Sequence, residues 1–126
     1  MKDYSAMSDF EINKAVAIHL GMKPFDAETG WQGLTKEPYV DVVVRGAGRL
    51  GAFNPCNKPA DAWPIIKKAE ISILKDNGLH LWCATSSAYW ADGAEWQIGG
   101  DVMDANPLRA AMIVFLMMKD RENNHD

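Results

Sequence analysis

Two stretches of this chain decide its fold: Asn54–Ile66, NPCNKPADAWPII, and Asn106–Lys119, NPLRAAMIVFLMMK. Each opens with Asn-Pro and then turns apolar. An Asn side chain can accept hydrogen bonds from the unpaired N–H groups of a helix start, and Pro at the first helical position loses no bond. The second stretch therefore predicts a helix that is capped by Asn106 and begins at Pro107.

The first stretch predicts a shorter helix. Asp61 is a good N-cap, and Pro64 would then be the third helical residue, where a missing N–H costs nothing. We expect this helix to span Ala62 to Lys68.

A third helix start lies near the N-terminus. Ser8 and Glu11 make the S-x-x-E capping box, in which each side chain satisfies an unpaired backbone N–H at the other residue. Apolar residues then follow at helical spacing, and Gly21 is a natural residue to end the helix. The pattern predicts a helix from Asp9 to Leu20.

The C-terminal helix is apolar nearly all round, and such a helix is either deeply buried or partly covered by a partner subunit. Full burial is difficult in a chain of 126 residues, so we expect a homodimer through this helix. Its longest apolar run, Ala110 to Met118, is far shorter than the roughly 20 residues of a membrane span, so we expect no membrane association.

The remaining patterns predict strands. Tyr39–Arg45 is β-branched, Ile71–Leu74 and Leu79–Thr85 flank an Asn-Gly turn, and Ala88–Ile98 is a second hairpin or a long loop around Asp92-Gly93. The segment from Met22 to Pro38 is a long loop that can hold a short strand. Because only turns join most of these strands, we expect antiparallel pairing.

The prediction is therefore one α+β domain over residues 1–126. An antiparallel sheet of about four strands packs against the N-terminal and C-terminal helices.

Charge and cysteine content narrow the function. The net charge of −4 argues against nucleic acid as a partner, since non-specific binding to phosphates needs excess Lys and Arg. Cys56 and Cys83 have no metal-ligand spacing, and the polar start of the chain has no apolar signal core. We expect free thiols, no metal, no cofactor and a cytoplasmic location.

One apparent nucleotide motif fails on inspection. Gly46–Gly51 matches G-x-G-x-x-G after a strand. That fingerprint needs a helix to begin at its glycines, so that the helix N-terminus faces the pyrophosphate. Two Pro and two Asn follow within Asn54–Pro59 and leave no room for such a helix. A glycine-rich turn or bulge is the better interpretation.

Candidate catalytic groups are sparse. Cys56 with His80 is conceivable as a nucleophile and base, but nothing local supports the pair. Asp101 and Asp104 lack the other acids of a calcium loop. Arg109 lies in the first turn of a helix, where the dipole disfavours a cation, so we expect a specific partner, either a carbonyl or a carboxylate such as Asp61 or Asp104. We assign no catalytic residue.

Aromatic residues are the better candidates for binding. Either they form a stacking surface for a ring or a protein partner, or alternation places Trp82 and one other tryptophan in the core. Trp31 lies in the long loop, where it either anchors a partner or pins the loop to the body. Arg45 and Arg49 flank the glycine-rich segment and can meet an anion. The candidate ligand- or partner-binding residues are Trp31, Arg45, Arg49, Trp82, Tyr89, Trp90 and Trp96.

Together with DYSAMSDFEINKAVA at residues 3–17, the two opening stretches give the chain a resemblance to a NinX-like family of small proteins of tailed phages and prophages. The resemblance implies an accessory protein of the infected bacterial cytoplasm and transfers no catalytic residue. We expect a non-enzymatic protein that binds a host protein or a small nucleotide-like molecule, for example to inhibit a host defence. The alternatives are a small hydrolase or nucleotide-modifying enzyme, and a structural or DNA-associated phage protein.

Overall fold

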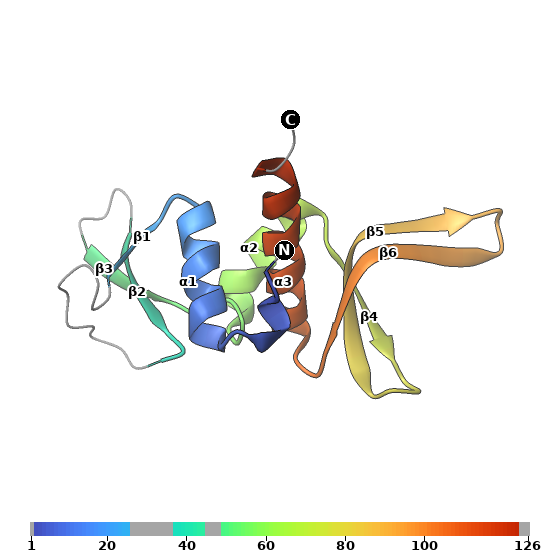
Figure 1. Cartoon of the computed structure of the whole chain (residues 1–126), viewed down its shortest axis with the longest axis horizontal. Helices are drawn as coiled ribbons and strands as arrows, with labels where there is room; N and C mark the ends of the chain where they lie inside the picture. Colours follow the sequence, from blue (N-terminus) through green and yellow to red (C-terminus); the bar gives the residue numbers. More distant parts are fainter. Residues whose placement is uncertain (1, 26–36, 45–48, 124–126) are drawn as a thin grey trace.

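A computed structural model describes residues 2–25, 37–44 and 49–123 (Figure 1). Helices and antiparallel strands share the chain, which confirms the predicted α+β class. The elements are η1 (Tyr4–Ala6), α1 (Asp9–His19), β1 (Lys23–Phe25), β2 (Val40–Val44), β3 (Arg49–Phe53), α2 (Pro59–Ala69), β4 (Ser72–Asp76), β5 (Leu81–Ala91), β6 (Glu95–Asp104) and α3 (Pro107–Asn123).

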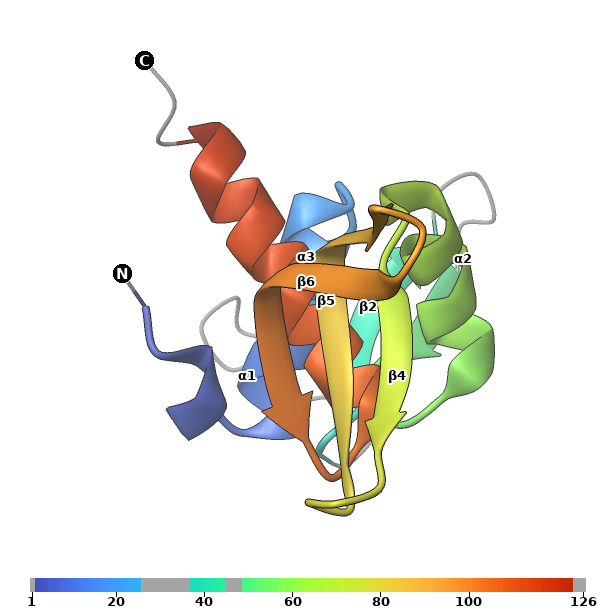
Figure 2. The ribbon, with the colours of Figure 1, turned by 90° about the vertical axis from the view of Figure 1, so that its right-hand side faces the viewer.

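The strands form two sheets where the sequence suggested one. Strands β1-β2-β3 make the first and β4-β5-β6 the second, and all pairs are antiparallel. The three helices lie between the sheets, with α1 against β1 and β2 and α3 against the second sheet (Figures 1 and 2). Helix α2 separates the sheets along the chain, because it carries the backbone from the end of β3 to the other side of the helical layer.

Helix α3 is the centre of the core. Every residue from Ala110 to Leu116 is buried within the single chain. Its apolar circumference is therefore covered by α1, α2 and the second sheet. This burial removes the reason for expecting a dimer through α3, and the dimer itself stays a prediction. No helix in the described parts of the chain is long and apolar enough to cross a bilayer.

The two Asn-Pro stretches meet through side-chain amides that are buried or half-buried. Asn13 of α1 is fully buried; its Nδ2 donates to Asn54 Oδ1 (2.8 Å) and to the Pro38 carbonyl (2.9 Å). Its Oδ1 accepts from the backbone N–H of Cys56 (3.0 Å). Asn106 Nδ2 in turn donates to the Cys56 carbonyl (2.7 Å), so both peptide groups of this turn are held from different helices.

Arg109 joins the starts of α1 and α3. Its guanidinium contacts Asp104 Oδ2 through Nε (3.1 Å) and Asp9 Oδ1 through Nη1 (2.7 Å). Nη2 donates to the Met7 carbonyl (2.7 Å). The expectation of a specific carboxylate or carbonyl partner is confirmed, with Asp104 as one of the two carboxylates that Arg109 contacts. The other candidate, Asp61, instead accepts from the Asn54 N–H (2.9 Å).

Most predicted helix ends agree with the structure. Ser8 and Glu11 form the full capping box, and Asn106 Oδ1 accepts from the Leu108 N–H (2.9 Å) and the Arg109 N–H (3.2 Å). Helix α2 differs, because it begins at Pro59. Proline pre-sets the backbone for a first helical turn, while the Asp61 carboxylate is committed to Asn54. Pro64 is consequently inside the helix.

Different kinds of turn connect the strands in the two hairpins of the second sheet. Asp92 and Gly93 both have positive φ (53° and 68°), and Ala91 pairs with Glu95, so of the hairpin and the long loop expected around Asp92-Gly93 the structure has the hairpin. The β4–β5 turn departs from the prediction. Here His80 takes positive φ (57°), and Asp76 Oδ1 accepts from the N–H groups of Gly78 (2.9 Å) and Leu79 (3.0 Å). The aspartate closes a longer turn that Asn-Gly alone does not predict.

Replacing Asn13 with Ala should lower the free energy of unfolding by about 2–3 kcal/mol, because it leaves the Cys56 N–H and the Pro38 carbonyl unpaired in the core. Urea denaturation at neutral pH measures the change. Asn77→Ala, at an exposed turn position, is the matched control and should shift stability by less than about 0.5 kcal/mol. Equal effects of the two changes would contradict a structural role for the buried amide.

Candidate functional site: an aromatic arm and a groove between helices

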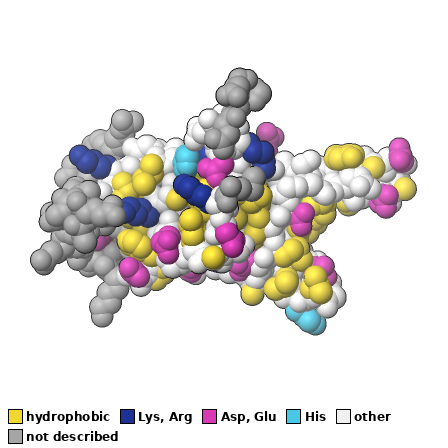
Figure 3. All heavy atoms as spheres, viewed as in Figure 1, with side chains coloured by type: hydrophobic (Ala, Val, Ile, Leu, Met, Phe, Trp, Pro, Cys, Tyr) yellow, Lys and Arg dark blue, Asp and Glu magenta, His cyan; other side chains and the backbone are white. Residues whose placement is uncertain are grey.

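A two-stranded arm projects from the second sheet. Strand β4 pairs with β5 only from Leu81 to Thr85, whereas β5 and β6 remain paired as far as Ala91 and Glu95. Residues 86–100, here called the aromatic arm, therefore extend beyond the three-stranded part of the sheet (Figures 1 and 3). An isolated two-stranded hairpin is only marginally stable in water. Large apolar side chains that are exposed on such a hairpin therefore point to a role other than folding.

The arm has one apolar face. Paired residues on antiparallel strands point to the same side, and the pairs Trp90↔Trp96 and Ala88↔Ile98 alternate with Tyr89↔Gln97. The Trp90 and Trp96 rings contact edge to face, with centroids 5.5 Å apart. They nevertheless remain 52% and 59% exposed, so about half of each ring is open to a partner.

The charged residues of the arm itself all have one sign. From Asp76 to Leu108 the sequence contains no Lys or Arg. Asp92 and Glu95 lie at or beside the tip, and both are exposed. Figure 3 shows the arm with hydrophobic and acidic side chains and no basic ones on the visible face. The arm therefore combines an apolar face with negative charge.

The direction of the arm is fixed at its base. Gly100 has a φ of +60°, and Arg121 of α3 donates to Ser86 Oγ (3.2 Å) on the opposite strand. Thr85 Oγ1 donates to the Gly99 carbonyl and accepts from the Ser87 N–H (3.0 Å). These contacts hold the point where the ribbon leaves the three-stranded sheet.

The predicted binding residues do not form one surface. Tyr89, Trp90 and Trp96 share the arm, but Trp82 lies about 25 Å of extended strand away from Trp90. It is half-buried beneath Lys75, whose ammonium lies 5.5 Å from the ring centroid. The alternative that places Trp82 and a second tryptophan in the core does not hold for Trp90 or Trp96.

The other candidates belong to a different part of the molecule. Trp31 and Arg45 lie outside the described residues. Arg49 begins β3 in the first sheet, on the opposite side of the helical layer from the arm (Figure 1). Residues 49–53 are a strand, so no helix follows Gly48 as a dinucleotide fingerprint requires.

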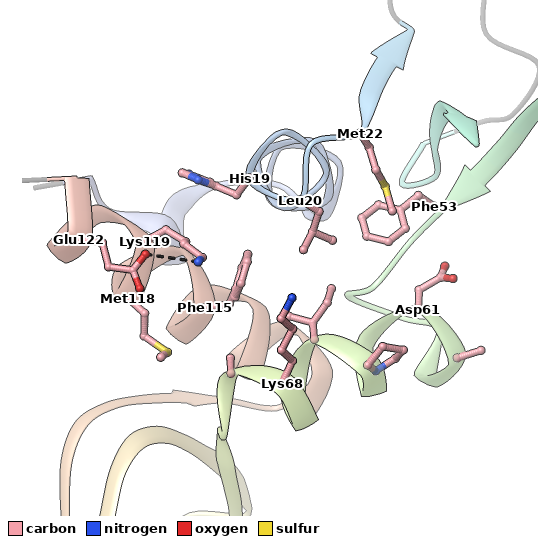
Figure 4. A pocket seen from close by; sticks show the side chains of 14 residues that line it. His19, Leu20, Met22, Phe53, Asp61, Lys68, Phe115, Met118, Lys119 and Glu122 are labelled. Carbon is pink, nitrogen blue, oxygen red and sulfur yellow. Dashed lines mark hydrogen bonds and ion pairs between the residues drawn. The ribbon is translucent and has the colours of Figure 1, made fainter. Parts of the chain in front are cut away.

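A groove that the sequence patterns do not predict lies between the helices. It has a volume of about 690 Å³ and is bounded by the end of α1, by α2 and by the second half of α3 (Figure 4). Figure 4 shows Leu20, Phe53 and Phe115 directed toward a common space, with Lys68 reaching in from α2. The groove draws residues from four separate segments, so no local pattern announces it.

The cysteines are poorly placed for nucleophilic chemistry. Cys56 is fully buried, and burial raises the pKa of its thiol to about 12. Burial and the neighbouring Asp101 carboxylate also raise the pKa of Cys83. A protonated thiol is a weak nucleophile. His80 lies in the exposed β4–β5 turn, and across the described ranges no three His, Cys, Asp or Glu side chains gather to hold a metal.

Changing Gly100 to Ala should lower the free energy of unfolding by about 1–2 kcal/mol, because an L side chain rarely adopts a φ of +60°. Gly99→Ala is the matched control, since its added carbon meets Ser87 only at 3.8 Å and no positive φ is involved. Thermal unfolding of both variants provides the test. A Gly100 variant as stable as the Gly99 variant would argue against a constrained base of the arm.

Cys56 should react with a thiol reagent only when the protein unfolds. In a Cys83→Ser background, we expect Ellman's reagent at pH 8 to label the remaining thiol at the rate of opening, and at once in denaturant. The raised pKa also predicts that stability is retained below about pH 9 and falls as pH rises toward about 12, since the unfolded thiol ionises first. Cys56→Ala should flatten that fall. Rapid stoichiometric labelling of the native protein would contradict this.

Comparison with known proteins places the chain in a family. None of the curated proteins compared with the chain matches it. Residues 3–119 match the family model described as Bacteriophage P22, NinX. This match includes the capping box of α1, the turn held by Asn13 and Asn106, the aromatic arm and most of α3. The chain therefore belongs to the bacteriophage P22 NinX family.

Proposed function

We propose that this phage accessory protein acts by binding a host protein in the cytoplasm of the infected bacterium, with the aromatic arm as the contact surface. The observation that carries the proposal is the half-exposed pair of Trp90 and Trp96 on a projecting ribbon. Tryptophan and tyrosine dominate the energetics of protein interfaces, and exposed apolar faces on otherwise polar surfaces commonly mark them.

The charge pattern indicates what kind of protein surface fits. Asp92 and Glu95 lie at the tip of the arm, and residues 76–108 contain no Lys or Arg. A partner that offers Arg or Lys around an apolar patch would gain ion pairs with these carboxylates and cation–π contacts with the rings. The same negative charge disfavours DNA or RNA as the ligand of this arm.

A catalytic role has less support. Of the groups considered for covalent chemistry, Cys56 has no access to solvent and a raised thiol pKa, and His80 belongs to an exposed turn. Binding of a partner is enough to account for the exposure of Trp90 and Trp96, without any catalysed reaction. A binding protein returns its partner unchanged, which separates this proposal from a hydrolase or a nucleotide-modifying enzyme.

The test is affinity capture from host lysate with three immobilised proteins: wild type, Trp90→Ala/Trp96→Ala and Trp63→Ala. Trp63 is 60% exposed on α2, so it matches the arm tryptophans in exposure but not in position. We expect a host protein retained by wild type and Trp63→Ala, with affinity for the double variant reduced roughly 30-fold or more, as for loss of an interface hot spot.

Thermal unfolding must first show that the double variant is folded. An identical set of captured proteins for all three baits would contradict the assignment of the arm. Capture of no host protein by the wild type would contradict the proposed function itself.

A further inference from the structure

The groove between the helices has the size and the lining of a small-molecule site. Its volume of about 690 Å³ lies within the range of roughly 300–1,000 Å³ that is common for such pockets. Apolar side chains form its floor: Leu20, Met22, Phe53, Ile65, Phe115 and Met118. Ile65, Phe53 and Phe115 are also part of the buried core, so this floor is fixed by the packing of the protein itself.

Two lysines and two carboxylates lie at the rim of the groove, and among the residues that the structure describes they differ in whether they have a partner. Asp61 accepts a hydrogen bond from the Asn54 N–H (2.9 Å), and Glu122 pairs with Lys119 (3.3 Å). Both carboxylates are therefore engaged. Lys68 has no ion pair or hydrogen bond with any residue that the structure describes, and in Figure 4 its ammonium reaches into the groove.

Lys68 lies on the side of helix α2 that faces the groove. Ala60, Pro64 and Lys68 follow one another at four-residue spacing and all line the groove. Lys67 is turned about 100° around the helix axis from Lys68 and does not line it. The two neighbouring lysines thus differ in position but not in type or charge.

We propose that this groove binds a small organic anion, in which an apolar or aromatic body rests on the floor and one carboxylate or phosphate group contacts Lys68. The groove combines an apolar base with one lysine at its edge that has no partner among the described residues. The site is separate from the aromatic arm and does not depend on it. It would give the protein a second binding activity, directed at a metabolite or signal molecule.

The experiment uses two fluorescent probes that differ in one charge. 8-Anilinonaphthalene-1-sulfonate carries a sulfonate, whereas N-phenyl-1-naphthylamine has a similar ring system without it. Both are titrated into the full chain carrying Trp90→Ala/Trp96→Ala, so that the arm contributes no apolar site. Lys68→Gln and Lys67→Gln, each added to this background, change the net charge equally.

We expect Lys68→Gln to weaken binding of the sulfonate probe about tenfold, as for loss of a charge-assisted contact, and to leave the neutral probe unaffected. Lys67→Gln should change neither. Ala60→Phe, at an exposed position of the groove wall, should block both probes while the protein stays folded by circular dichroism. Equal effects of the two lysine changes, or full binding to Ala60→Phe, would overturn the proposal.

Competition then distinguishes the sources of the anion. Displacement of the sulfonate probe by decanoate indicates an acyl carboxylate, and displacement by adenosine monophosphate indicates a nucleotide. Displacement by neither would show that the groove does not take such anions and would overturn the proposal. So would a dimer in sedimentation that leaves the probes no site, because the groove would then be covered by a second copy.

Discussion

The fold depends on one buried polar junction, at which three segments distant in the sequence satisfy each other's hydrogen bonds. The amide of Asn13 and the amide of Asn106 hold the two sides of the Cys56 peptide, one at its N–H and the other at its carbonyl. A buried amide that is fully paired specifies one arrangement, while a partly paired one is costly. This junction therefore sets how α1, α2 and α3 meet, and the ion pairs of Arg109 with Asp9 and Asp104 join the starts of α1 and α3.

From that junction, α3 runs through the middle of the molecule with a sheet on either side. Its central turns are fully buried, so it acts as a common support for surfaces that face in different directions. The second sheet rests on α3 and extends into the aromatic arm, whose base is contacted by Arg121. The other side of α3 contributes Phe115 and Met118 to the groove. The two candidate binding surfaces thus share one helix but differ in charged groups, since the arm has only carboxylates and the groove has both lysines and carboxylates.

The sequence predicts local structure correctly where the interacting atoms are close in sequence. The capping box at Ser8 and the Asn106 cap each involve residues within a few positions of each other. The predicted start of helix α2 at Ala62 is wrong because Asp61, a residue type that often caps helices, accepts its hydrogen bond from the Asn54 N–H, and the helix begins at Pro59. Competition between two partners for one carboxylate is decided by tertiary contacts, which a local pattern does not contain.

The sequence by itself determined the α+β class, the antiparallel pairing, the main helix starts and the family, since these follow from periodicity, capping chemistry and specific stretches. It also gave three aromatic residues of the arm but grouped them with Trp82 and with Arg49, which lies in the other sheet. Only the tertiary structure divided the strands into two sheets, exposed the Trp90–Trp96 pair and formed the groove around Lys68. The physical reason is that exposure and enclosure depend on which distant segments pack together, and that packing is a property of the whole chain.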